Sequence, residues 1–311
     1  MNLTDLAALA ARQLLRPEGV SSDYVRPLKN LAIYQQARPS TFEAAIYEPV
    51  VTLVLHGRKE LMLGTQTFRM DAGECLVVSH DLPVQGRVIA APYLALLFDI
   101  ELDTLRDLVA ATADTPLPSV PACSLAVQSC DDRVVDALYR YLELAHSPAD
   151  AAVLGPLVAR EIHYRLAFAP FGGMLRDLIH HDSHASAIAR AIARLRREFR
   201  SPIEIPELAR SVGMSASAFH KHFKAITAAS PLQYRKGLQL LEARRLLRAG
   251  TLSVTSAAFE VGYESPAQFS RDYARHFGNS PTYDRPGNQR PANPPRHDQL
   301  KIHHRRDERA R

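Results

Sequence analysis

The stretch IPELARSVGMSASAFHKHFKAIT, residues 205–227, decides the fold of the C-terminal third of this chain. One helix face is predicted by apolar residues at the i, i+3, i+4, i+7 spacing, namely Ile205, Leu208, Ala209 and Val212. Gly213 ends this helix, because glycine takes a positive φ at little cost. Ser215 is a hydroxyl N-cap for a second helix, whose buried face is Phe219, Phe223 and Ile226. The segment therefore predicts a helix-turn-helix.

The outer face of the second predicted helix is polar and basic. It carries Ser217, His220, Lys221 and Lys224. A helix of this kind can enter the major groove of DNA. Taken alone, the segment is equally compatible with a helical hairpin that has a solvated face.

The same pattern returns about fifty residues later. Ser253 is a cap, Val254, Ala257, Ala258 and Val261 form the inner face, and Gly262 ends the helix. Ser265 and Pro266 then start a helix whose buried residues are Phe269, Tyr273 and Phe277. Its outer face carries Gln268, Ser270 and Arg271. A long helix between Ser230-Pro231 and Gly250 would hold the two copies about one DNA turn apart, roughly 34 Å.

These residues resemble the DNA-binding domain of the AraC/XylS family of bacterial transcription regulators. The matching segments are AxxxGMSxxxFxxxFK (209–224), SPxxY (230–234), AxxLL (243–247) and AxxxxGYxxxxxFSR (257–271), within residues 187–283. The resemblance implies base contacts from Ser217, His220, Lys221, Gln268, Ser270 and Arg271. Lys and Arg suit guanine and Gln suits adenine. Lys224, Arg235 and Arg245 are candidates for phosphate contacts.

One departure lies at the end of this match. The family pattern of glycine, a hydrophobic residue, any residue and proline, followed by Tyr-Arg, is here Gly278-Asn279-Ser280-Pro281-Thr282-Tyr283-Asp284. The change affects the end of the domain and leaves both predicted reading helices intact.

Composition and charge agree with two functional parts. The chain has 311 residues, 46% of them hydrophobic, which is enough for two cores. Residues 186–311 carry 23 Lys and Arg against 11 Asp and Glu, whereas residues 1–185 carry 15 against 22. A basic part joined to an acidic part is typical of a DNA-binding module attached to another domain. No apolar run is long enough for a membrane span, and the N-terminus predicts a short amphipathic helix rather than an export signal.

Residues 31–100 read as a series of short β segments separated by turn residues. They include VVTLVLH (50–56), KELMLG (59–64) after a turn at Gly57-Arg58, ECLVVS (74–79), residues 85–89 and residues 93–100. Short strands at this spacing predict an antiparallel sandwich or barrel. The order of the segments over residues 30–100 resembles the cupin-like N-terminal domain of one branch of the family, which implies sensing of a small molecule or signal.

Five polar or reactive residues near these strands are candidates for contacts with an effector, namely Tyr47, His56, Cys75, His80 and Tyr93. Catalytic cupins cluster His and Glu around a metal, but His56 and His80 stand alone, so neither a metal nor a cofactor is expected. The three cysteines form no CxxC pair, which favours the cytosol. Cys75 has two interpretations, a buried inert thiol or a sensor of electrophiles and oxidants.

The expected fold class is α+β, a cupin-like barrel followed by helices and then an all-α domain with two helix-turn-helix motifs joined by a long helix. The expected divisions are a sensor domain (1–111), a helical connector (112–186), a DNA-binding domain (187–284) and a disordered basic tail (285–311). The connector helices would either dimerise or pack on the barrel.

The sequence thus predicts a non-enzymatic, cytoplasmic regulator of transcription. The family resemblance favours an activator, with promoter DNA, RNA polymerase and a small-molecule effector as partners and no membrane contact. A cupin enzyme with an appended helical domain and a DNA binder without sequence preference are the alternatives.

Overall fold

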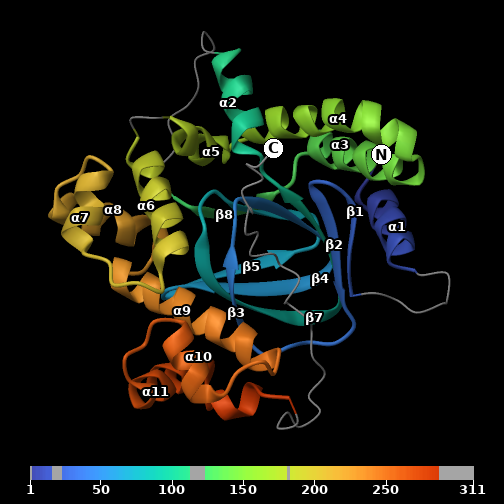
Figure 1. Ribbon diagram of the computed structural model, residues 1–311. Coiled ribbons are helices and arrows are strands. Elements are labelled where there is room, and N and C mark those ends of the chain that lie inside the picture. Colours follow the sequence, from blue (N-terminus) through green and yellow to red (C-terminus); the bar gives the residue numbers. More distant parts are fainter. Residues whose placement is uncertain (1, 16–22, 113–122, 181–182, 287–311) are drawn as a thin grey trace, which may run out of the picture.

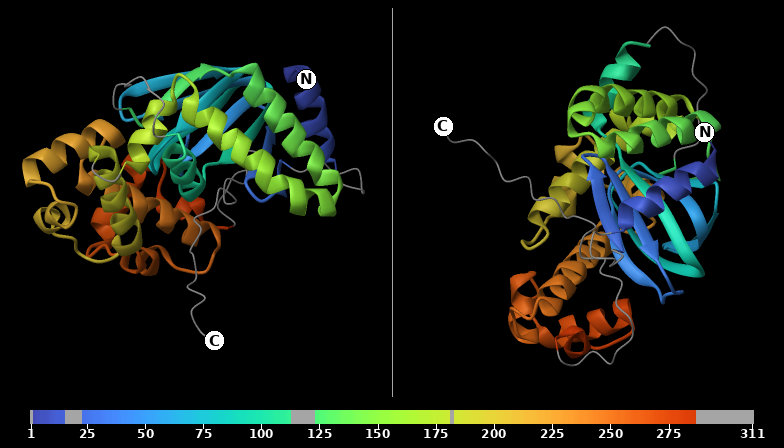
Figure 2. Two further views of the ribbon diagram at one scale, coloured as in Figure 1. Left: turned by 90° about the horizontal axis from the view of Figure 1, so that it is seen from above. Right: turned by 90° about the vertical axis from the view of Figure 1, so that its right-hand side faces the viewer.

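The computed structural model describes residues 2–15, 23–112, 123–180 and 183–286, and it places a β-barrel between two groups of helices (Figures 1 and 2). Helices α1–α5 cover one face of the barrel, and helices α6–α11 form a separate body beside it. The α+β fold class expected from the sequence is confirmed. The expected tail, apart from Arg285 and Pro286, lies outside the described residues.

The barrel is an open, antiparallel sheet of eight strands in the order β1-β2-β7-β4-β6-β8, with β3 paired to β7 and β5 paired to β4. The strands are β1 (Tyr24–Leu28), β2 (Leu31–Gln36), β3 (Glu43–Tyr47), β4 (Val50–Leu63), β5 (Gln66–Asp71), β6 (Glu74–Val78), β7 (Leu82–Asp99) and β8 (Leu125–Ser129). The two longest strands, β4 and β7, run side by side and belong to both halves of the barrel.

A β-bulge in β4 reverses which side chains face the barrel interior. Before the bulge the interior residues are even-numbered, as at Val50 and Val54, and after it they are odd-numbered, as at Leu61 and Leu63. Side chains alternate strictly along a strand, so one extra residue is enough to reverse the pattern. Gly57 permits the bulge, because its φ is +77° and a Cβ there would lie 2.5 Å from the carbonyl oxygens of Ala90 and Pro92.

This bulge corrects one expectation. The turn expected at Gly57-Arg58 does not exist, because residues 50–63 form one strand. The expected segments 85–89 and 93–100 are likewise joined in β7. Strands β1, β3 and β8 were not anticipated, and β8 adds residues from beyond position 111 to the same sheet.

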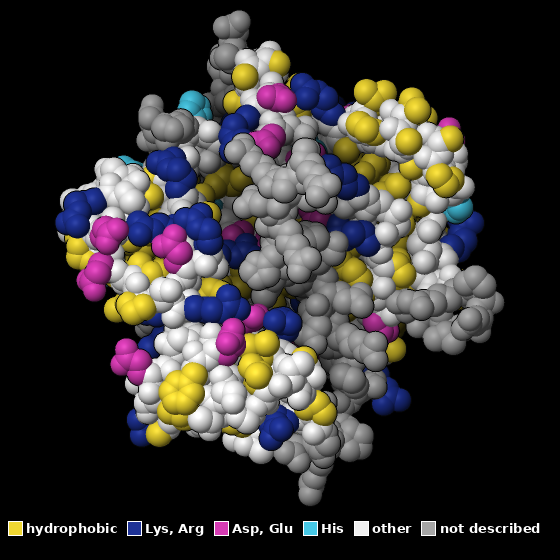
Figure 3. Space-filling view, viewed as in Figure 1, with side chains coloured by type: hydrophobic (Ala, Val, Ile, Leu, Met, Phe, Trp, Pro, Cys, Tyr) yellow, Lys and Arg dark blue, Asp and Glu magenta, His cyan; other side chains and the backbone are white. Residues whose placement is uncertain are grey.

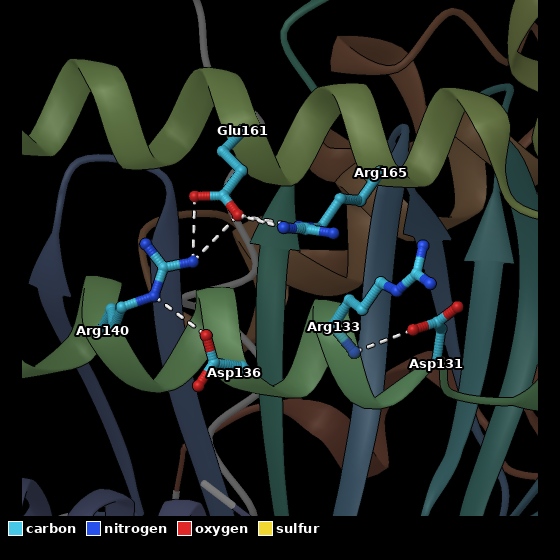
Figure 4. A network of polar contacts seen from close by, with 6 residues as sticks. All are labelled: Asp131, Arg133, Asp136, Arg140, Glu161 and Arg165. Atoms are coloured by element: carbon cyan, nitrogen blue, oxygen red, sulfur yellow. Dashed lines mark hydrogen bonds and ion pairs between the residues drawn. The ribbon is translucent and has the colours of Figure 1, made fainter.

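The helices beside the barrel share a core with its outer face. They are α1 (Leu3–Leu14), α2 (Leu102–Ala110), α3 (Asp132–Glu143), a short 3-10 helix η1 (Leu144–His146), α4 (Pro148–Phe168) and α5 (Gly172–Ile179). Figure 4 shows Glu161 of α4 between Arg165 and Arg140, and Arg140 also pairs with Asp136. This network holds α3 alongside α4.

Helix α4 also carries apolar side chains on its solvent side. Val153, Leu154, Leu157 and Tyr164 are exposed, and hydrophobic side chains gather over this region in Figure 3. A helix that is apolar on its outer face as well as its inner one is expected to be covered in its functional state. No helix in the described part of the chain is both long enough and apolar enough to cross a membrane.

The second body has one core built from six helices, which are α6 (His184–Glu198), α7 (Ile205–Ser211), α8 (Ala216–Thr227), α9 (Pro231–Arg248), α10 (Val254–Glu260) and α11 (Pro266–Phe277). A 3-10 helix, η2 (Pro281–Asp284), closes it. The caps predicted at Ser215, Ser253 and Ser265 all accept backbone N–H groups, and so does Ser230 at the start of α9. The expected pair of helix-turn-helix motifs joined by one long helix is thus present.

Two buried histidines are neutral in the folded chain. Burial lowers the pKa of His163, whose Nε2 accepts the Glu101 N–H at 2.8 Å while its Nδ1 donates to the Ala159 carbonyl at 2.7 Å. Burial also lowers the pKa of His80, which donates to the Ala185 carbonyl at 3.1 Å. The unfolded chain therefore takes up protons at a higher pH than the folded chain does.

We expect the free energy of unfolding to fall as the pH drops below about 6.5, where an unfolded histidine becomes protonated. Each of the two imidazoles contributes a loss of at most about 1.4 kcal/mol per pH unit below that value. Urea unfolding at pH 7.5, 6.5 and 5.5 measures this slope, and His163→Gln is expected to remove part of it. An unfolding midpoint that stays constant from pH 7.5 to 5.5 would contradict the assignment.

Candidate DNA-recognition surface and effector site

The first helix-turn-helix motif is formed by α7 and α8. Gly213 has a φ of +75° in the turn, and the Met214 N–H reaches back to the Ala209 carbonyl at 3.0 Å. Ser215 then caps α8 by accepting the Ala218 N–H at 3.3 Å. Phe219 and Phe223 are fully buried, which fixes the rotation of α8 about its own axis.

This orientation of α8 places the residues predicted to contact bases on the solvent side of the helix. Ser217, His220, Lys221 and Lys224 are all exposed on α8. On α11, Gln268 and Arg271 are exposed and Ser270 is half-buried. The exposed face of α8 carries no carboxylate. Both helices therefore present donors to solvent where a base edge or a phosphate could meet them.

The second motif is held in place from behind by α6 and α9. At Gly262, a Cβ would lie 2.1 Å from the Arg200 carbonyl oxygen, so only glycine allows this close approach. The Phe199 carbonyl accepts from Gln239 at 3.2 Å and from Arg235 at 2.9 Å, both on α9. The turn of the second motif, the end of α6 and the middle of α9 thus meet at one point.

Two of the three candidates for phosphate contacts have other partners. Arg235 binds the Phe199 carbonyl, and burial lowers its pKa. Arg245 donates to both carboxylate oxygens of Glu242 at 2.8 and 3.0 Å. Arg235 is thereby held against the end of α6, whereas the Arg245 side chain is 49% exposed and Lys224 is exposed as well.

The departure from the family pattern at Asp284 has a structural explanation. Asp284 is buried and accepts the Tyr273 hydroxyl at 2.8 Å. It also forms ion pairs with Arg248 at 3.0 Å and Arg244 at 3.2 Å. The aspartate therefore ties η2 to α9 and to the buried side of α11.

In the barrel, two of the five candidate effector residues lie together. Tyr47 and Tyr93 both face the interior, beside Tyr34. The side chain of Lys59 lies among the three rings, with its Nζ 5.6 Å from the Tyr34 and Tyr47 centroids and 5.8 Å from the Tyr93 centroid. Sequence reasoning missed Lys59, because its inward orientation depends on the bulge at Gly57.

The other three candidates lie elsewhere. His56 is exposed at the bulge, where its Nδ1 contacts the Pro92 carbonyl. Cys75 belongs to the core on the outer face of the barrel and is 1% exposed. A hydrogen bond with Cys130 and burial raise the pKa of the Cys75 thiol well above its ordinary value, which makes it a weak nucleophile.

His80 lies at the contact between the barrel and the DNA-binding helices. Several polar contacts from both sides meet near it. Arg196 of α6 pairs with Glu48 at 2.7 Å and with Asp81. The Tyr234 hydroxyl of α9 donates to the Asp81 carbonyl at 3.0 Å, and the Ser124 hydroxyl donates to the Ile226 carbonyl at the end of α8. This contact therefore touches a recognition helix directly.

A cavity of about 640 Å³ lies along the same contact. Barrel residues Ala44, Met62 and Val84 line one side, and Leu240, Arg275 and His276 line the other. The barrel and the DNA-binding body are thus only partly in contact along this side.

Two family models match the chain. One, described as the AraC-type transcriptional regulator N-terminus, covers residues 27–174, and a helix-turn-helix domain covers residues 208–285. The regulator CdhR of Pseudomonas aeruginosa is 30% identical over 158 residues, which is 49% of this chain and 44% of CdhR. ExsA of the same species is 24% identical over 258 residues, 79% of this chain and 90% of ExsA.

Among solved structures, ToxT from Vibrio cholerae shares the fold with a TM-score of 0.52 at 9% sequence identity, over 85% of this chain and 99% of ToxT. The matched regions coincide with the two halves described above, the barrel with its helices and the paired helix-turn-helix motifs. The chain therefore belongs to the AraC family of helix-turn-helix transcription regulators.

Proposed function

We propose that this chain binds an asymmetric, two-part DNA site in which α8 and α11 enter successive major grooves. The observation that carries the proposal is that both helices pack on α9 while their predicted reading residues are solvent-accessible. At 1.5 Å per residue, the 18 residues of α9 extend over about 27 Å. This length supports a separation close to one turn of DNA.

The barrel is the sensor in this proposal, and the regulator acts as an activator, as the family resemblance favours. A binding event in the barrel would change promoter occupancy through a coupling free energy, which is typically about 1–3 kcal/mol. The contact through Arg196, Tyr234 and Ser124 is the physical connection on which such a coupling depends.

Selection of sites from random DNA by the full chain tests the proposal. We expect a bipartite motif with two half-sites about 10 base pairs apart. DNA binding without a recovered motif would favour the alternative of a non-specific DNA binder. Absence of DNA binding would overturn the proposal.

Two variants distinguish base-specific contacts from contacts with the phosphate backbone. Arg271→Ala is expected to cost about 1–3 kcal/mol and to relax the preference at one position of the selected site. Lys224→Ala is the matched control, since loss of a phosphate contact should weaken binding to all sequences alike and lower the salt slope by about 1. Fluorescence anisotropy on the selected site and its single-base variants measures both. Equal losses on all sequences for Arg271→Ala would refute its role in base recognition.

The contact between the two bodies is centred on Arg196, whose side chain is 20% exposed. Burial lowers the pKa of Arg196, but the Asp81 and Glu48 carboxylates outweigh this effect and hold it above the ordinary value. The guanidinium is thus charged and paired with two residues of the barrel, so its removal would leave two carboxylates without their partner.

We expect Arg196→Met to lower the free energy of unfolding by about 1–3 kcal/mol, less than for a fully buried pair because the site is partly solvated. Hydrogen exchange should become faster in α6 and at the C-terminal end of α8. Arg197→Met is the control, because the Arg197 side chain is 70% exposed and should change stability by less than about 0.5 kcal/mol. Unchanged exchange in α6 would show that Arg196 does not hold the two bodies together.

We also propose that the exposed face of α4 pairs with α4 of a second copy. The face offers Val153 and Leu157, and it carries Arg160 and Asp150, neither of which has an ion-pair partner among the described residues. An antiparallel pair with its axis near Gly155 brings Val153 opposite Leu157 and Arg160 opposite Asp150 of the other copy. The face thus brings apolar side chains opposite apolar ones and opposite charges together across the two-fold axis.

Sedimentation of the full chain at micromolar concentration tests this pairing. We expect a dimer for the natural sequence and at least a tenfold weaker dimer for Leu157→Glu, because a charge would be buried in an apolar contact. Phe259→Glu is the control, since Phe259 is an exposed apolar residue on α10, away from this face. A monomeric natural chain would refute the pairing.

A further inference from the structure

Two cysteines lie side by side in the core between the barrel and the helices that cover it. Strand β6 pairs with β8 so that Cys75 lies opposite Gln128. Cys130 directly follows β8, and its N–H donates to the Gly73 carbonyl at 2.9 Å. Opposite residues of an antiparallel pair share a face of the sheet, and so do residues two apart in one strand. Cys75 and Cys130 are therefore diagonal neighbours on the outer face of the barrel, and both belong to its core.

Gly73 brings the two thiols together. It lies opposite Cys130 and has no side chain, so Cys75 is the first side chain that Cys130 meets on this face of β6. The φ of Gly73 is +89°, which favours glycine at this position. The Cys75 thiol donates a hydrogen bond to the Cys130 sulfur, and this bond together with burial raises the pKa of Cys75. The two sulfur atoms are thus in contact.

The two thiols differ in their access to solvent. Cys75 is 1% exposed, whereas Cys130 is half-buried. A small oxidant can therefore reach Cys130 but not Cys75. Because Cys75 keeps its proton and the Cys130 sulfur accepts it in a hydrogen bond, Cys130 is the better nucleophile of the pair. One reachable thiol in contact with a second, buried thiol is typical of cysteine pairs that respond to oxidants.

We propose that Cys75 and Cys130 form a redox-responsive dithiol, which a hydroperoxide converts into a disulfide. This inference goes beyond the proposed function, since it adds a covalent modification site to the barrel domain. It also gives Cys75 a part that its burial alone would exclude, because the outer thiol reacts first. A disulfide that forms only on oxidation agrees with a reducing compartment, where cytosolic disulfides are usually transient.

The reaction has two steps. The Cys130 thiol attacks one oxygen of the hydroperoxide, the O–O bond breaks, and the products are a sulfenic acid on Cys130 and an alcohol, or water when the oxidant is hydrogen peroxide. The Cys75 sulfur then attacks the Cys130 sulfur, and the Cys75 proton leaves with the hydroxyl group as water. Two thiols are thus oxidised and one peroxide is reduced. The contact between the sulfurs makes the second step intramolecular, which offsets the weak nucleophilicity of Cys75.

Formation of the bond changes the position of α3. Diagonal neighbours have Cα atoms about 7–8 Å apart, whereas a disulfide usually joins Cα atoms about 4.4–6.8 Å apart. Cys130 must therefore move toward β6. The next residue, Asp131, caps α3 by accepting the Arg133 N–H at 2.7 Å (Figure 4). Since Arg140 of α3 pairs with Glu161 of α4, the movement reaches both helices.

Peptide mass spectrometry of the full chain tests the proposal. The reduced chain, freed of reductant, is treated with hydrogen peroxide, and the remaining thiols are alkylated before digestion without reductant. We expect a cross-linked peptide that joins Cys75 to Cys130 and disappears after treatment with dithiothreitol. Hydrogen exchange at the start of α3 should be slower in the oxidised chain than in the reduced chain, because the bond fixes this end to β6.

Two variants resolve the order of the steps. Cys130→Ser should abolish the cross-link and leave Cys75 as a thiol, because the buried sulfur is not reached by the oxidant. Cys75→Ala should stop the reaction at the sulfenic acid, which dimedone traps on Cys130. Each variant tests the order by itself, so a failure of Cys75→Ala to fold would leave the result for Cys130→Ser decisive.

Cys123→Ser is the matched control. Cys123 is half-buried like Cys130, but it precedes β8, so the length of this strand separates the two residues. We expect the cross-link to form unchanged in this variant. A disulfide that includes Cys123, or Cys75 and Cys130 both remaining as thiols at a peroxide dose that oxidises Cys123, would overturn the proposal.

The readout is a covalent bond in the chain without DNA, so it is independent of the proposed function. If the disulfide forms but the chain selects no bipartite site, the dithiol stands and the proposed function fails. If a bipartite site is selected but no disulfide forms, only the inference about the two cysteines fails.

Discussion

The packing of α9 against several partners at once is the constraint on which the rest of this structure depends. Both helix-turn-helix motifs pack on α9, α6 contacts it from behind, and strands β3 and β7 touch it from the barrel. Because one rigid helix makes all these contacts, the spacing of α8 and α11 cannot change independently of the barrel contact. Any rearrangement at the barrel must move α9 as a whole or detach it.

Much of the DNA-binding half could be predicted from the sequence because its signals are local. The apolar spacing around Phe219 and Phe269, the serine caps and the glycine turns each act within one or two helical turns. The long helix between the motifs was readable for the same reason. The features that could not be predicted depend on partners that are distant in the sequence. One example is the burial of Asp284 between Arg244 and Arg248. The same holds for Arg235, whose acceptor is a carbonyl of α6.

The barrel shows where the prediction of strands from alternating hydrophobic residues fails. Residues 50–63 contain an apolar run, a Gly-Arg pair and a second run, which looks the same for a hairpin and for a bulged strand. Pairing with β7 on both sides of Gly57 decides in favour of the bulge. That choice places Lys59 inside and Glu60 outside, so the inward orientation of Lys59 could not be predicted before the strand partners were known. Tyr47 and Tyr93, predicted as polar residues near strands, face the interior, whereas Cys75 and His56 share that neighbourhood without sharing the interior.

The arrangement of β3 indicates that one short strand, and not a long series of contacts, connects the barrel interior with the DNA-binding helices. Three consecutive residues divide between the two sides of the strand, with Tyr47 on the inside and Ile46 and Glu48 on the outside. Among the described strands, β3 pairs with β7 alone, so the rest of the sheet does not depend on its ladder. The outer contact is mostly polar and borders a cavity, so a coupling of a few kcal/mol is enough to alter it.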